Sequence, residues 1–279
     1  MASTGNAKPL GCAWYLTGVC NYDCPYCYDQ AKPQVHPSIR MADVAGVFGA
    51  LQEARGPLEI ALTGGEPTLH PAFGDILAYL SGAGHDLVIS TNLSCGPEPF
   101  LEAARQPSRC SLNASFHPSH ADMREFGPAV RRLLDAGFRV VPSYVMYPPN
   151  VEALPRHEAE LHAFAPGLAF GRMAFLGEWQ GRHYPLAPQG EPGSESPAAG
   201  SPGERGAQAR YCRAGQDYFA VLWTGEIARC VAGAPLTGDR WPTVRLVDRA
   251  LPCALDCHCA DMHRLWADGP SDAEDGETT

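Results

Sequence analysis

The sequence has no apolar run long enough to cross a membrane, no secretory signal and no excess of basic charge. A membrane-spanning helix needs roughly 18 to 20 apolar residues, and no segment approaches that length. Residues 1–10 lack the apolar stretch of a signal peptide. The net charge of -10 disfavours nucleic acid and anionic membranes as partners. We therefore expect a cytoplasmic protein with no nucleic-acid partner and no membrane partner.

The chain also lacks the composition of a disordered protein. Of its 279 residues, 45% are hydrophobic, which is enough for one large domain or for a large and a small one. Eleven cysteines in a secreted protein would indicate disulfides, but without a signal peptide their clustered spacing favours metal ligation.

The first cysteine cluster is one ligand short of a closed metal site. Cys20, Cys24 and Cys27 follow the spacing C-x3-C-x2-C on one short loop. A structural zinc site takes four protein ligands, whereas three thiolates suit an iron-sulfur cube with one iron left open. Taken alone, the cluster is also compatible with a zinc knuckle or a set of redox thiols.

With aromatic Tyr26 before its last cysteine, this loop resembles the signature of the radical S-adenosylmethionine (SAM) superfamily. A second resemblance follows the apolar run Leu58–Leu62, where Gly64, Gly65, Glu66 and Pro67 match the Gly-Gly-Glu-Pro element of that family. Such an element alone is also an ordinary turn. The resemblance implies that SAM chelates the open iron and that this element contacts its amino group through the backbone, which glycine permits.

Hydrophobic periodicity predicts alternating strands and helices. Strand-like runs occur at Ala13–Leu16, Leu58–Leu62, Leu87–Ser90, Ser111–Phe116, Val140–Val145 and Leu168–Ala174. Helical patterns lie between them, around Val44–Leu51, Phe73–Leu80, Phe100–Ala104, Val130–Leu134 and Val151–Phe164. This alternation predicts an α/β fold whose parallel sheet carries helices on its outer face and its site at the carboxyl ends of the strands. The resemblance implies a partial (β/α)6 barrel over residues 11–185.

Further candidate ligands of the cofactor lie on or just after the predicted strands. The resemblance implies that Ser90, Thr91 and Asn92 contact the ribose or methionine part of SAM, although such residues are common at strand ends. Ser115 and Arg172 are placed to point into the barrel, where Arg172 would bind a carboxylate through two hydrogen bonds. A surface or structural role is equally open for both.

Histidines and isolated cysteines give weaker signals. His117 and His120 are candidate substrate contacts, but their setting favours a plain turn. Three unclustered cysteines are expected to be small buried side chains: Cys12, Cys95 and Cys110.

Composition divides the remainder of the chain. Residues 186–209 are rich in Pro, Gly, Ser and Glu and are predicted to form a flexible linker. Residues 1–10 are expected to be an N-terminal extension, residues 210–266 a small cysteine-rich domain, and residues 267–279 an acidic tail.

That C-terminal domain resembles the twitch and SPASM domains, which add auxiliary 4Fe-4S clusters to the same superfamily. A β-hairpin predicted over Tyr218–Cys230 carries Cys230 back toward Cys212. The candidate ligands are Cys212, Cys230, Cys253, Cys257 and Cys259. Five cysteines suggest the shorter twitch form with one cluster, while a zinc site built from the same thiolates remains open.

One cluster takes at most four of these five thiolates. Cys212 and Cys230 are the firmer ligands, and Cys253, Cys257 and Cys259 compete for the other places. The spare thiol is either inert or a hydrogen donor to a substrate radical, a role for which Cys257 is the candidate. With three ligands, the cluster would instead bind substrate at its open iron.

The resemblance implies reductive cleavage of SAM to a 5'-deoxyadenosyl radical, driven by an external electron donor such as flavodoxin or ferredoxin. The radical would abstract hydrogen from a small polar substrate, leading to dehydrogenation or epimerisation in natural-product biosynthesis. Modification of a ribosomally made peptide is the alternative. It is less favoured because only about ten residues precede the first strand, where relatives often carry a leader-binding domain. A non-catalytic iron-sulfur or zinc protein, acting as redox sensor or scaffold, is the alternative from another class.

Overall fold

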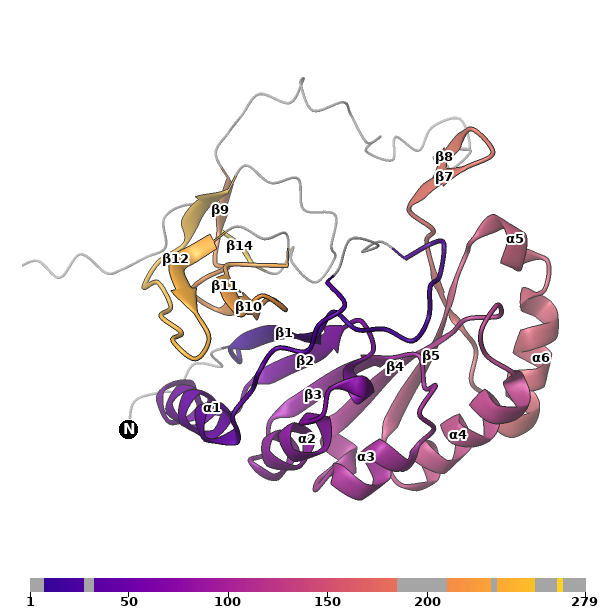
Figure 1. Cartoon of the computed structure of the whole chain (residues 1–279), viewed down its shortest axis with the longest axis horizontal. Coiled ribbons are helices and arrows are strands. Elements are labelled where there is room, and N and C mark those ends of the chain that lie inside the picture. The colour runs from indigo at the N-terminus through magenta and orange to yellow at the C-terminus, as the bar shows by residue number, and fades with distance from the viewer. Residues whose placement is uncertain (1–7, 28–32, 185–209, 232–234, 254–264, 268–279) are drawn as a thin grey trace, which may run out of the picture.

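Nine strands in one sheet form the body of the protein (Figure 1). The computed structural model describes residues 8–27, 33–184, 210–231, 235–253 and 265–267. Strand order across the sheet is β12-β11-β10-β1-β2-β3-β4-β5-β6. The first six strands are parallel and adjacent in chain order: β1 (Gly11–Thr17), β2 (Glu59–Gly64), β3 (Asp86–Thr91), β4 (Cys110–Phe116), β5 (Arg139–Val145) and β6 (Gly171–Met173). The predicted parallel sheet of six β/α units is confirmed.

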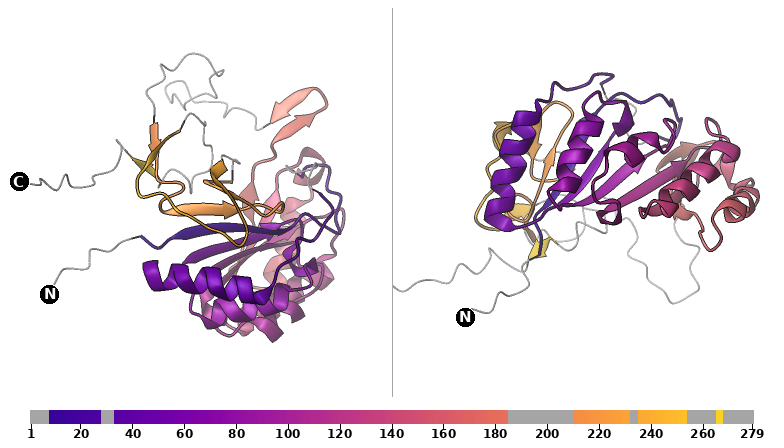
Figure 2. Two further views of the ribbon diagram at one scale, coloured as in Figure 1. Left: turned by 60° about the vertical axis from the view of Figure 1, so that its left-hand side comes forward. Right: turned by 90° about the horizontal axis from the view of Figure 1, so that it is seen from below.

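Helices cover one face of this parallel region (Figures 1 and 2). They are α1 (Met41–Arg55), α2 (Phe73–Gly82), α3 (Glu98–Ala103), α4 (Met123–Asp135), α5 (Pro148–Val151) and α6 (Leu154–Phe164), with short 3-10 turns η1 (Pro67–Leu69) and η2 (Pro107–Arg109). Among the helices of the described residues, none has the length and apolar character needed to cross a bilayer.

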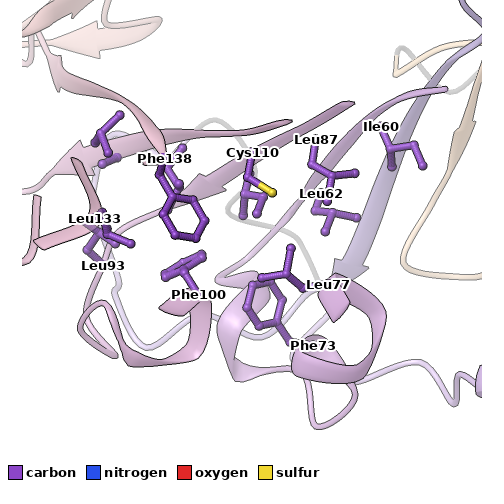
Figure 3. Close-up of a cluster of buried hydrophobic side chains, with 14 of the residues drawn as sticks. Ile60, Leu62, Phe73, Leu77, Leu87, Leu93, Phe100, Cys110, Leu133 and Phe138 are labelled. Carbon is purple, nitrogen blue, oxygen red and sulfur yellow. The ribbon is translucent and has the colours of Figure 1, made fainter. Parts of the chain in front are cut away.

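The core lies between this face of the sheet and the helices. Alternate residues of each strand point to it, so that Leu62, Leu87 and Cys110 meet Phe73 of α2 and Phe100 of α3 (Figure 3). All of these side chains are buried, and their removal from water is the main force that holds the helices on the sheet.

The opposite face of the sheet carries polar residues at the carboxyl half of its strands. The strand register aligns Ser90 with Asn113, and Ser115 with Ser143. We call this the inner face, because it is the concave side of a partial barrel. One face of the sheet thus packs against the helices in the apolar core. The other, the inner face, is the candidate location of a binding site.

Part of the C-terminal region extends the same sheet. Strand β10 (Tyr218–Val221) pairs parallel with β1, and β11 (Glu226–Ala228) and β12 (Pro235–Arg240) follow in antiparallel order. The predicted hairpin is therefore confirmed, and it lies directly beside the first strand.

Two smaller sheets complete the described structure. One contains β9 (Arg210–Cys212) between β13 (Leu251–Cys253) and β14 (Trp266–Ala267). The other is the hairpin of β7 (Gly177–Trp179) and β8 (Arg182–Tyr184), which projects from the sheet beyond β6 (Figure 1). The predicted linker over 186–209, the tail from residue 268 onward, Cys257 and Cys259 lie outside the described residues.

Unclustered cysteines are placed differently from one another. Cys12 and Cys110 are buried as predicted, but Cys95 is exposed, so its expected burial is wrong. It follows β3 in a surface turn.

Candidate functional site

The three-cysteine loop begins directly after the carboxyl end of β1. Cys24 is buried, and Cys20 and Cys27 are half-buried. The Cys27 amide donates to the Cys24 carbonyl at 3.0 Å, which closes a tight turn between these two cysteines. Burial raises the pKa of the Cys24 thiol to about 11, so binding as a thiolate requires a metal to compensate for the lost solvation.

The base of the loop is held by the chain that returns from it. The Thr17 hydroxyl donates to the Val35 carbonyl at 3.1 Å and lies 3.0 Å from Nδ1 of His36. Gln34 reaches the same turn, accepting from the Cys20 amide at 3.4 Å. Entry and exit of the loop are therefore fastened together beside β1.

The Gly-Gly-Glu-Pro element packs directly against the entry to the cysteine loop. The Gly65 amide donates to the Thr17 carbonyl at 2.7 Å, and the Glu66 amide donates to the Val19 carbonyl at 2.8 Å. A Cβ at Gly64 would lie 2.2 Å from the Thr17 carbonyl oxygen, and one at Gly65 would lie 2.0 Å from that of Val19. Both glycines are thus required by the approach of two backbones, a constraint that the sequence alone did not reveal.

The Glu66 carboxylate is buried and connects the element to β3. Its Oε1 accepts from the Thr68 amide at 3.2 Å, from the Thr68 hydroxyl at 2.7 Å and from the Thr91 hydroxyl at 2.9 Å. Its Oε2 accepts from the Asn92 amide at 2.7 Å. Burial raises the pKa of Glu66, and these hydrogen bonds oppose that rise. The side chain therefore fixes the spacing between the ends of β2 and β3.

Residues 90–92 take different positions. Ser90 is half-buried on the inner face, whereas the Thr91 hydroxyl is occupied by Glu66. The Asn92 side-chain amide donates to Oδ1 of Asn21 at 3.1 Å and lies 4.0 Å from the Cys20 sulfur. Asn92 thus reaches the cysteine loop itself, and Ser90 lies on the inner face, aligned with Asn113.

His117 also contacts the cysteine loop, although its sequence setting favoured a plain turn. The turn is present, since the His120 amide donates to the His117 carbonyl at 2.9 Å. In addition, Nδ1 of His117 lies 3.4 Å from the Cys24 sulfur and 3.0 Å from the Tyr26 hydroxyl, and its ring stacks on Tyr26. Burial, aided by the charge of nearby His120, lowers the pKa of His117 to about 4.

Ser115 faces the inner side of the barrel as predicted, where its hydroxyl lies 2.8 Å from that of Ser143. Arg172 does not. It is aligned with buried Tyr144, so it belongs to the face packed by the helices, and its guanidinium lies 3.5 Å from Glu158 of α6. The prediction that Arg172 points into the barrel is therefore wrong. Side chains alternate along β6, and the inner face belongs to Gly171 and Met173.

The chemistry of this loop fits an iron-sulfur cube. Three thiols come from one short turn, and soft thiolates are the ligands that such clusters take. Within the described ranges, no three His, Cys, Asp or Glu side chains are grouped around a point that one metal ion could occupy. A cube binds each cysteine to a different iron, so its ligands need not converge in that way.

A second group of thiols lies in the C-terminal region. Cys212 and Cys230 share a small buried cluster with Ala214 and Leu265. The Ala214 amide lies 3.4 Å from the Cys212 sulfur, in position to donate to a thiolate. Cys253 ends β13, which pairs with the strand that carries Cys212.

The protein thus combines a parallel sheet covered by helices on one face with a three-cysteine loop after the first strand and a glycine turn after the second. This is the arrangement of a partial-barrel domain with a candidate iron-sulfur site. Residues 14–116 match the family described as "Radical SAM superfamily". Over these residues the chain is similar to the radical SAM domain, a class of domain that uses a 4Fe-4S cluster and SAM.

Several curated relatives match parts of the chain, and two of them are described here. "PqqA peptide cyclase" of Xanthomonas axonopodis pv. citri is 26% identical over 196 residues, which are 64% of this chain and 47% of the relative. "GTP 3',8-cyclase" of Photorhabdus laumondii is 38% identical over 66 residues, 23% of this chain and 20% of the relative. The chain thus spans less than half the length of these relatives.

Among solved structures, Streptococcus suis SuiB bound to precursor peptide SuiA superposes with a TM-score of 0.53 at 12% identity. The match covers 83% of this chain and 62% of SuiB. At this identity the likeness shows a common fold, and it extends well beyond the segment that the family comparison matches.

Proposed function

We propose that this protein cleaves SAM reductively and uses the resulting radical to abstract hydrogen from a substrate held on the inner face. The observation that carries the proposal is the direct backbone pairing of the Gly-Gly-Glu-Pro element with the cysteine loop. Through Gly65 and Glu66, the ligands of an open iron and the turn that would contact SAM form one hydrogen-bonded unit.

When bound, the cluster and SAM supply a 5'-deoxyadenosyl radical that removes hydrogen from an unactivated carbon. Cys20, Cys24 and Cys27 hold the iron, and the backbone of Gly64 to Pro67 receives the amino group of SAM. Ser90 and Asn92 are the candidates for contact with its ribose or methionine part, because Asn92 reaches the loop and Ser90 lies on the inner face near the carboxyl end of β3. Such fixed donors orient the reactants without reorganisation during the reaction.

Uncharged side chains line the carboxyl half of the described inner face. The strand register aligns Tyr15 with Thr63, Ser90 with Asn113, Ser115 with Ser143, and Val145 with Met173. The charged residues Glu59 and Arg139 begin their strands, away from the cysteine loop. This arrangement supports a substrate whose reacting part is neutral and forms hydrogen bonds, such as a polyol or an amide.

A small polar molecule is the first substrate candidate, with dehydrogenation or epimerisation as the outcome. Cys212, Cys230 and Cys253, together with Cys257 or Cys259, would hold an auxiliary 4Fe-4S cluster. A thiol left without iron, with Cys257 as candidate, would return hydrogen in an epimerisation. An external donor of the flavodoxin or ferredoxin type would supply the electron, and we propose a cytoplasmic location.

A peptide is the second substrate candidate, and two observations favour it. A curated match over 64% of this chain is to a peptide cyclase. In addition, Val141 and Met173 are about half-exposed on the inner face of β5 and β6, at 48% and 50%. Exposed apolar side chains of this kind suit an apolar side chain of a bound peptide.

Anaerobic reconstitution tests the proposed chemistry. About eight irons per chain would indicate two 4Fe-4S clusters, and dithionite with SAM should then release 5'-deoxyadenosine and methionine. Zinc in place of iron, or intact clusters that do not cleave SAM, would support the non-catalytic alternative.

Deuterium transfer separates the two substrate candidates. Deuterated cyclitols and aminosugars are compared with peptides that carry deuterium on apolar residues. Deuterium in 5'-deoxyadenosine identifies the molecule whose hydrogen is removed. The inner-face variant Met173→Asp should weaken turnover of a peptide strongly, because it places a charge among apolar contacts. Its effect on a polyol should be smaller.

A further inference from the structure

One guanidinium in the C-terminal region lies among three segments that each carry a cysteine. Arg229 directly precedes Cys230 at the end of β11. Facing it are β9, which ends with Cys212, and β13, which ends with Cys253. These segments come from separate parts of the chain and approach one another at this residue.

Arg229 donates hydrogen bonds to four backbone carbonyls on the two facing segments. Its Nε reaches the Ala214 carbonyl at 3.1 Å, and its Nη2 reaches that of Cys212 at 3.5 Å. On β13, Nη1 reaches the Pro252 carbonyl at 3.2 Å and Nη2 reaches that of Leu251 at 3.3 Å. A planar guanidinium has enough donors to do this from one side chain, which lysine or glutamine does not.

These four carbonyls are next to cysteine ligands. Cys212 itself supplies one, and Leu251 and Pro252 immediately precede Cys253. In the strand register Leu251 is opposite Cys212 and Cys253 is opposite Arg210. The guanidinium therefore fixes the backbone of all three cysteines relative to one another.

The charge of Arg229 has no carboxylate partner among the described residues, whereas neighbouring Arg213 pairs with Asp217 at 3.4 Å. A thiolate-ligated cluster is anionic, and a cation beside it stabilises the added electron. The position of Arg229 thus suits both the assembly of such a site and its electronic tuning.

We propose that Arg229 is the positioning residue that assembles the auxiliary iron-sulfur site, and that its charge raises the reduction potential of the cluster. The inference rests on the auxiliary cluster of the proposed function. Hydrogen bonds to the carbonyls bring Cys212, Cys230 and Cys253 together before iron binds, and the positive charge then favours the reduced cluster.

The test uses the full chain with Cys24→Ala, in which the auxiliary cluster is the one expected to remain. Arg229→Gln should lower the affinity for the cluster about tenfold, measured as iron and sulfide retained against a chelator, and should lower the midpoint potential in an EPR-monitored titration. Arg229→Lys keeps the charge but not the fork of donors. It should therefore lose iron more readily than Arg229, while its remaining cluster keeps the original potential.

Arg213→Gln is the matched control, since it removes a neighbouring arginine whose charge is already paired. It should retain both iron and potential. If Arg229→Gln kept its iron content and its reduction potential, the inference about Arg229 would be overturned, while the proposal of an auxiliary cluster would stand. If the Cys24→Ala protein with native Arg229 bound no iron, the auxiliary cluster of the proposed function would itself be refuted. Loss of the first cluster in an Arg229 variant of the otherwise native chain would also overturn the inference, because the effect would then not be confined to this site.

Discussion

The two cysteine-bearing regions of this protein are built in opposite ways. In the first, Cys20, Cys24 and Cys27 lie on one loop, and the chain segments around it fix that loop through hydrogen bonds. In the second, Cys212 and Cys253 end two paired strands and Cys230 follows a third strand, β11. The side chain of Arg229 donates hydrogen bonds to backbone carbonyls beside Cys212 and Cys253. A loop can carry its ligands as a local unit, whereas ligands on separate strands depend on tertiary contacts.

This difference has a consequence for the order of assembly. The first loop is attached to β1 and β2. These strands are central in the sheet and are buried against α1 and α2. The second site involves β9 and β13, which belong to a small separate sheet with a buried cluster of a few side chains. We therefore expect the first site to persist when the second is lost, as in an Arg229 variant. The substitutions in the first loop test the converse, whether the second site keeps its iron when the first is lost.

The largest effect is expected from removing one ligand of the first loop. Cys24→Ala deletes the buried thiol that lies beside His117 and Tyr26. It should abolish SAM cleavage and lower the iron content from about eight to about four per chain, because a cube with two remaining ligands is not retained. Iron analysis, EPR and release of 5'-deoxyadenosine measure the result.

The matched control is Cys95→Ala, which removes an exposed cysteine that belongs to neither region. Iron content and SAM cleavage should stay as in the native protein. If Cys24→Ala retained all its iron, the loop would not be the site of the first cluster.

A smaller effect is expected from adding one carbon to Gly65. Its Cβ would lie 2.0 Å from the Val19 carbonyl oxygen, so the loop must move away from β2 in Gly65→Ala. We expect a loss of at least ~2 kcal/mol in the free energy of unfolding and a displaced cysteine loop that binds its cluster weakly. Urea unfolding and chelator challenge measure the two effects, and the iron of the second site should remain.

Gly46→Ala is the matched control for that substitution. Gly46 is exposed inside α1, and nothing lies within 4 Å of the position of its Cβ. Alanine there should stabilise the protein by about 0.5–1 kcal/mol. Equal stability of the two alanine variants would contradict the proposed packing of the loop on β2.

The fold of the first region was predictable because it depends on local patterns. The period of apolar residues located the six parallel strands, and the spacing of cysteines and glycines located the loop and the turn. The sequence did not predict correctly which side chains of short or exposed segments point inward. All three residues of β6 are exposed, so no pattern of apolar residues in the sequence indicates which face Arg172 takes, and its predicted inward direction is wrong. Contacts across long sequence separations, such as His117 with Cys24, leave no periodic signal.

In the second region the sequence predicted the hairpin of β10 and β11 but not where it lies. Nothing in the residues of β10 specifies that it pairs with β1, since that pairing is chosen by the free edge of the sheet. The role of Arg229 was equally hidden, because its partners are backbone carbonyls of many possible residues. Side-chain chemistry is readable from a sequence, while contacts with the backbone depend on the tertiary structure.

The smallest expected effect is a loss of folding stability at low pH, and here too the two regions differ. His85 is fully buried at the start of β3, and its Nδ1 accepts the Leu58 amide at 3.0 Å, so the folded state requires its neutral form. Burial, with the charge of Arg109, lowers the pKa of His85, and Asp86 opposes this. The described residues from 210 onward contain no histidine.

Because the folded pKa of His85 lies below the unfolded value of about 6.5, the unfolded chain binds more protons as pH falls. The stability that the neutral imidazole provides is therefore complete above that value and declines below it, by at most ~1.4 kcal/mol per pH unit. Urea unfolding of the metal-free protein at pH 7.5 and 5.5 should show this decline, and His85→Gln should reduce it. Between pH 7.5 and 8.5 the stability difference between His85→Gln and the native protein should not change. An identical decline in both proteins below pH 6.5 would show that His85 is not the group responsible.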